Sequence, residues 1–106
     1  MSTMLRRYEI LLPRRSNDGT SFPDEMFGDV LLDLRRRFGA VSSESQIIHG
    51  VWTAENRVFR DELSRVFVDV EDTPEARAFF EQFKELLKAK FQQLDIWMTS
   101  HPVERH

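Results

Sequence analysis

The stretch IIHGVWTAENRVFRDEL, residues 47–63, decides the fold of this chain. Residues 40–52 and 57–71 are rich in β-branched and aromatic residues, and the TAEN segment at 53–56 separates them. Two such runs around a short polar segment are typical of a β-hairpin. The sequence therefore predicts two consecutive antiparallel strands in the middle of the chain.

A strand and a helix are predicted on each side of this hairpin. Residues 4–12 alternate as a strand, and Gly39 is placed to end a helix whose apolar positions are Met26, Val30, Leu31, Leu34 and Phe38. After the hairpin, Thr73 and Pro74 form a helix start ahead of an apolar face: Ala76, Phe79, Phe80, Phe83, Leu86, Leu87 and Phe91. Residues 93–99 alternate again and predict a fourth strand.

The resulting order, β-α-β-β-α-β, is the ferredoxin-like pattern of an α+β fold. Right-handed crossovers place two helices on one face of a four-stranded antiparallel sheet, with the first and third strands in the centre. We expect one domain over residues 1–100 and a polar C-terminal tail over residues 101–106.

Composition excludes several function classes. The 106 residues include no cysteine, which removes thiolate chemistry and cysteine metal sites. The net charge of −3 argues against general nucleic-acid binding, and no segment has the apolar length of a membrane span. His49, His101 and His106 lack metal-ligand spacing, so we expect no metal and no cofactor. Without a signal-like apolar run after Met1, a cytoplasmic location is expected.

The predicted sheet leaves one face without a helix. Strand alternation places large apolar residues there, and a soluble monomer rarely exposes so many together. We therefore predict a homodimer packed sheet to sheet through these residues: Leu11, Ile48, Trp52, Phe59, Leu63, Phe67 and Trp97.

The pairing within the hairpin supports this assignment. A turn centred between Ala54 and Glu55 places Glu44 opposite Arg65 and Gly50 opposite Phe59. A bulge at Gly50 would reverse the facing of the residues before it.

The same face supplies the candidate ligand-binding residues: Trp52, Asp61, Arg65, Asp95 and Trp97. The tryptophans could stack on a flat ligand, although large aromatics more often anchor interfaces. The charged residues are expected in an ion-pair network with Arg7, Glu9 and Asp69, while the alternative is a pocket carboxylate that accepts a proton. No catalytic set is recognisable, and Tyr8 is expected in the core with its hydroxyl at an edge.

Four segments carry a resemblance: RFGAVSSESQ (37–46), HGVWTAENRVFRDEL (49–63), VFVDVEDTPE (66–75) and LKAKFQQLDIWMT (87–99). Together they resemble a small uncharacterised family of bacterial proteins of about this length, which implies no functional residues. By architecture alone, the chain also resembles the dimeric α+β barrel group, which includes cofactor-free monooxygenases, isomerases and haem-handling proteins. Neither predicted helix contains a histidine, which counts against haem.

Two functions follow from these observations. The first is a homodimeric domain that binds a small molecule or a protein partner at or near the sheet face. The second is a cofactor-independent enzyme, monooxygenase- or isomerase-like, with its pocket in a dimeric barrel or between helices and sheet. A closed cavity with an inward carboxylate would favour the enzyme.

Overall fold

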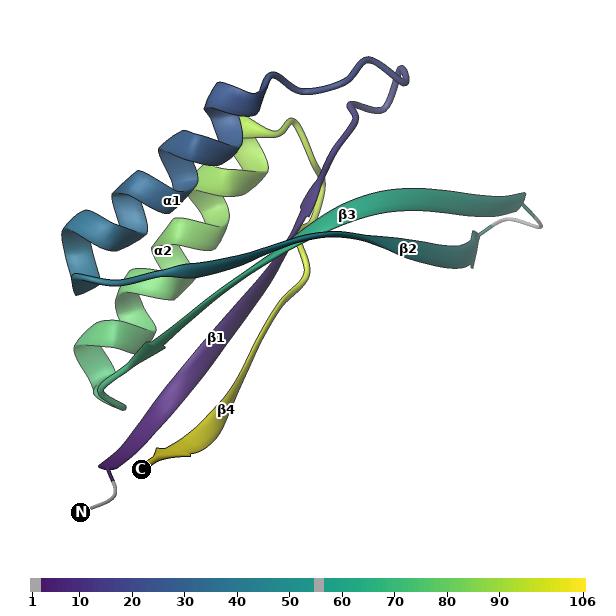
Figure 1. The fold of residues 1–106 in the computed structure, drawn as a ribbon. Coiled ribbons are helices and arrows are strands. Elements are labelled where there is room, and N and C mark those ends of the chain that lie inside the picture. The colour runs from purple at the N-terminus through teal and green to yellow at the C-terminus, as the bar shows by residue number, and fades with distance from the viewer. Residues whose placement is uncertain (1–2, 55–56) are drawn as a thin grey trace.

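The computed structural model describes the backbone of residues 3–54 and 57–106 and the side chains of residues 3–42 and 62–106. The elements are β1 (Thr3–Pro13), α1 (Asp24–Phe38), β2 (Ser42–Ala54), β3 (Arg57–Val70), α2 (Pro74–Lys90) and β4 (Met98–Arg105). The strands lie in the order β2-β3-β1-β4, and every neighbouring pair is antiparallel. Both helices cover one face of the sheet (Figure 1). The α+β class and the predicted element order are confirmed.

Local sequence signals set the helix ends. Ala76 donates its backbone N–H to the Thr73 hydroxyl at 3.1 Å, and Pro74 is the first residue of α2. Gly39 has a φ of 83° and donates its N–H to the Arg35 carbonyl at 2.7 Å, which ends α1. Glycine adopts this left-handed conformation without the steric cost that a Cβ would add.

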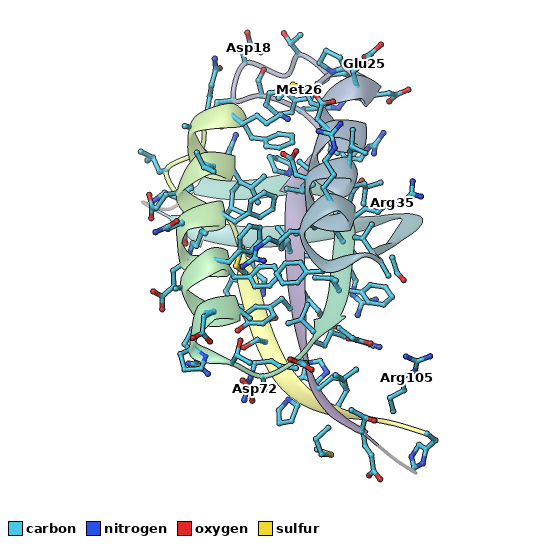
Figure 2. The ribbon with its side chains drawn as sticks, turned by 90° about the vertical axis from the view of Figure 1, so that its left-hand side faces the viewer. Asp18, Glu25, Met26, Arg35, Asp72 and Arg105 are labelled. Carbon is cyan, nitrogen blue, oxygen red and sulfur yellow. The ribbon has the colours of Figure 1, made fainter. Side chains whose placement is uncertain are left out.

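The core lies between the helices and the sheet, where side chains fill the space between the two layers (Figure 2). Tyr8 stacks on Phe80 with a ring centroid separation of 3.8 Å, and the Phe38 ring stacks on the same Phe80 at 5.3 Å. The buried apolar residues of the described chain are Tyr8, Ile10, Leu12, Val30, Leu34, Val66, Val68, Val70, Ala76, Phe80, Phe83, Leu87, Phe91 and Ile96. Leu86, predicted on the apolar face of α2, is exposed.

The hairpin register differs from the prediction. Ser43 pairs with Val66, but Ile47 pairs with Ser64, so the register shifts between Ser43 and Ile47 and not at Gly50. Beyond the shift, Gly50 lies opposite Asp61, where Phe59 was predicted. The far half of the hairpin extends away from the helices (Figure 1).

The fourth strand lies later in the sequence than predicted. Residues 92–97 lead from the end of α2 to the sheet, and β4 then pairs along β1 from Ile10↔Met98 to Thr3↔Arg105. The predicted tail at 101–106 was therefore wrong, since residues 101–105 belong to the sheet. Pro102 and the polar residues suggested a tail, but β4 is an edge strand, where a proline costs no ladder hydrogen bond.

Candidate functional site

The face of the sheet opposite the helices, called here the open face, is described for alternate residues of β1, β3 and β4. They are Leu5, Arg7, Glu9 and Leu11 of β1, Leu63, Arg65, Phe67 and Asp69 of β3, and Thr99, His101 and Val103 of β4. The prediction that charged residues on this face form ion pairs is confirmed for two pairs.

Arg7 and Asp69 are direct cross-strand partners and form a two-point pair. Arg7 Nε donates to Asp69 Oδ1 at 2.7 Å, and a terminal nitrogen of Arg7 donates to Oδ2 at 2.9 Å. Arg65 donates to the carboxylate of Glu9 in the second pair. The two-point geometry of the Arg7–Asp69 pair fixes orientation as well as charge.

Phe67 lies between these two pairs. The guanidinium carbons of Arg7 and Arg65 lie 4.6 Å and 4.5 Å from the centre of its ring. A guanidinium at this distance from an aromatic ring is attracted by the ring's negative faces. The centre of the open face is therefore a half-buried cluster of charges around one aromatic ring.

The hydrogen bonds in this cluster perturb its titration. Hydrogen bonds from Arg7 lower the pKa of Asp69, against an opposing effect of burial, and the charges of Arg7 and His101 lower it further. The hydrogen bond from Arg65 lowers the pKa of Glu9 in the same way. The lowered pKa makes Asp69 and Glu9 weaker bases, whereas a proton-accepting pocket carboxylate requires a raised pKa.

The predicted ligand-binding residues do not converge in the described structure. Arg65 is on the open face, paired with Glu9. Asp95 was predicted on the same face, but it lies 3.0 Å from Lys84 Nζ of α2, and that hydrogen bond lowers the pKa of its carboxyl. The sequence analysis misplaced Asp95 because β4 begins at Met98, later in the sequence than predicted. Trp97 is 64% exposed beside Leu11, and the side chains of Trp52 and Asp61 lie outside the described residues.

The predicted interface residues are only partly described. Leu11, Leu63 and Phe67 are half-buried on the open face, and Trp97 is exposed at its margin. The side chains of Ile48, Trp52 and Phe59 lie outside the described residues. Whether these seven residues form an interface stays a prediction.

A pocket of about 210 Å³ lies on the other side of the sheet, between α2 and the strands β1 and β4; we call it the α2–β4 pocket. It is lined by Tyr8, Arg77, Phe80, Glu81, Lys84, Met98, Thr99 and Ser100. Tyr8 is 5% exposed, and within the described part of the chain its hydroxyl has no hydrogen-bond partner. A buried polar group without a partner is rare in folded proteins.

Sequence reasoning offered a pocket between helices and sheet as one option, but it did not identify the residues that line this pocket. It recognised Tyr8 as a core residue, which the structure confirms, but it placed the hydroxyl at an edge, whereas the hydroxyl is buried. The remaining polar lining comes from the outer side of α2, a pattern typical of a solvated helix face, and from Thr99 and Ser100, next to the predicted tail. The signal that could have found the pocket was the amphipathic Tyr8 among purely apolar core positions.

Metal and membrane sites find no support in the described residues. No group of three or more His, Asp or Glu side chains there could hold a metal ion. Within the same residues, no helix combines the length and apolar character needed to cross a membrane.

Comparisons with known proteins give one informative match. No family model matches the sequence, and no curated protein matches it, so the resemblance to a bacterial family is unconfirmed. Among solved structures, a phage SAM lyase in complex with S-methyl-5'-thioadenosine matches with a TM-score of 0.71 and 12% identity, over 92% of this chain and 80% of that chain. At this identity the match shows a shared fold.

Proposed function

We propose that this chain is a small-molecule-binding protein whose ligand occupies the α2–β4 pocket. One observation carries the proposal. Tyr8 lines this pocket, and its buried hydroxyl has no hydrogen-bond partner among the described residues. Pockets with a mostly apolar lining and a few convergent polar groups are typical ligand sites. The bound nucleoside in the structurally similar SAM lyase supports a small-molecule role for this architecture and suggests a first compound to test.

Binding is favoured over catalysis. The cofactor-independent enzyme would need a buried, inward carboxylate, whereas Glu81, the carboxylate among the described lining residues, is exposed. The ionised Asp69 and Glu9 lie on the opposite face of the sheet.

A ligand screen tests the proposal. Thermal shift and calorimetry with S-methyl-5'-thioadenosine, adenosine and aromatic acids should reveal a ligand that stabilises the protein. Glu81→Trp should abolish this stabilisation, because the large ring would fill the pocket from an exposed helix position. The matched change Gln82→Trp, at the adjacent exposed position outside the lining, should leave binding unchanged. Equal binding by both variants would place the ligand elsewhere.

We also propose that the chain forms a homodimer through the open face. Apolar Leu11, Leu63 and Trp97 lie beside two arginines and two carboxylates, so a copy related by a twofold axis could match both apolar and charged groups. Such a face, left in water, would expose an apolar patch that is unusual in a monomer.

Sedimentation velocity tests the dimer. Trp97→Gln should weaken dimerisation at least about tenfold, because exposed tryptophans dominate interface energetics. Leu94→Gln is the control, since Leu94 is 96% exposed and precedes the stretch that pairs with β1. A wild-type monomer at micromolar concentration would remove the proposal.

A further inference from the structure

We propose that the α2–β4 pocket binds an oxyanion, the carboxylate or phosphate group of a small molecule, through the hydroxyls of Tyr8 and Ser100. The inference rests on the proposed small-molecule function and names the chemical group that the pocket selects.

Tyr8 supplies the first donor. Its ring is held against Phe80 by stacking at 3.8 Å with an interplanar angle of 11°, so the hydroxyl cannot swing into solvent. A buried hydroxyl without a partner loses its hydrogen bonds to water and gains none in return. A ligand oxygen that accepts from it removes that cost. Tyr8 lines the pocket and its hydroxyl is buried, so the proposal requires a small shift of the surrounding side chains that opens the hydroxyl to a bound molecule.

Ser100 supplies the second donor. Tyr8 and Ser100 are direct cross-strand partners on β1 and β4, so their side chains project from the same face of the sheet next to each other. A terminal nitrogen of Arg6 donates to Ser100 Oγ at 3.2 Å, and Arg6 Nε lies 3.1 Å from Asp72. Because the Ser100 oxygen accepts from a guanidinium, its own hydrogen is left to donate. Two neighbouring hydroxyl donors match an oxygen-rich acceptor.

The charges around the pocket favour a negative ligand. Two cations, Arg77 and Lys84, line it against one carboxylate, Glu81. Lys84 also pairs with Asp95, which leaves Arg77 as the cation best placed to attract an anion. Attraction of this kind weakens with added salt, which gives the test a second readout.

The test is a set of amide NMR titrations of the full chain. Benzoate should shift the amide signals of Tyr8, Ser100 and Arg77, whereas benzamide, its neutral counterpart of similar shape, should bind at least about tenfold more weakly. Inorganic phosphate in a separate titration shows whether the site takes phosphate as well as carboxylate.

Three variants sharpen the assignment. Tyr8→Phe keeps the stack on Phe80, so it should leave the thermal midpoint unchanged or higher while it weakens benzoate binding about tenfold. Arg77→Gln should weaken binding about threefold, in line with a partly screened charge. Arg35→Gln is the matched control, because Arg35 projects from α1 away from the pocket (Figure 2).

The outcomes separate this inference from the proposed function. Equal binding of benzoate and benzamide, or NMR shifts that Tyr8→Phe does not change, would overturn the proposed oxyanion site. The proposed small-molecule function would still stand or fall with the Glu81→Trp ligand screen. No pocket shift with benzoate or phosphate would also overturn the oxyanion site. Selective binding of either anion, lost in Tyr8→Phe and kept in Arg35→Gln, supports it.

Discussion

The two faces of this sheet are built from alternate residues of the same strands, yet they are held together differently. On the face beneath the helices, Ile10 and Leu12 are fully buried and Val66 and Val68 nearly so. On the open face, the intervening positions of the same strands carry Arg7, Glu9, Arg65 and Asp69 around Phe67. Burial of apolar area stabilises the first face, while partly exposed ion pairs contribute little to the second. The open face is therefore free to change without loss of the fold.

The largest effect on the free energy of unfolding is expected when one phenylalanine on each face is replaced by alanine and the two costs are compared. Phe80→Ala should lower the free energy of unfolding by about 3–5 kcal/mol, because Phe80 is 1% exposed and contacts three other rings. Phe67→Ala should cost about 1–2 kcal/mol, since it loses a half-buried ring and two guanidinium contacts. Urea denaturation at low protein concentration, where a dimer would dissociate, measures both. Equal costs would contradict the contrast between the faces.

Breaking the Arg7–Asp69 pair should lower the free energy of unfolding by a smaller amount that depends on pH. The folded-state pKa of Asp69 lies below its unfolded value, so the pair stabilises the fold above the unfolded pKa and loses this effect as the pH falls through the folded pKa. Asp69→Asn should therefore cost about 1 kcal/mol at pH 7 and progressively less below about pH 4. Asp33→Asn, an exposed change on α1, is the matched control for the loss of one negative charge. A cost for Asp69→Asn that persists at pH 2 would show that the carboxylate charge is not its source.

The smallest effect is expected at Leu94, in the connection between α2 and β4, and Ile96 of the same connection provides the contrast. Leu94 is 96% exposed and Ile96 is 2% exposed, although alternation along the sequence predicted the same facing for both. Leu94→Ser should change the free energy of unfolding by less than about 0.5 kcal/mol. Ile96→Ala should cost about 2–5 kcal/mol in the same denaturation series. A large cost at Leu94 would mean that it is covered in the protein in solution, for example by a second copy.

The sequence by itself determined the elements whose signals are local. Thr73 and Pro74 started α2, Gly39 ended α1, and period-two alternation in β1 and β3 assigned Tyr8, Ile10, Val66 and Val68 to one face. Capping, glycine conformation and strand pleat act within a few residues, so they can be read without knowing the fold.

Only the tertiary structure decided where the C-terminal segments lie and which polar side chains contact one another. The length of β1 draws residues 98–105 into the sheet as its edge partner, and this placement moves Asp95 to Lys84 and brings Ser100 beside Tyr8. The hairpin shift between Ser43 and Ile47 likewise depends on pairing with β3. Strand pairing and pockets join residues that are distant in the chain, and their energies depend on partners that no short stretch of sequence specifies.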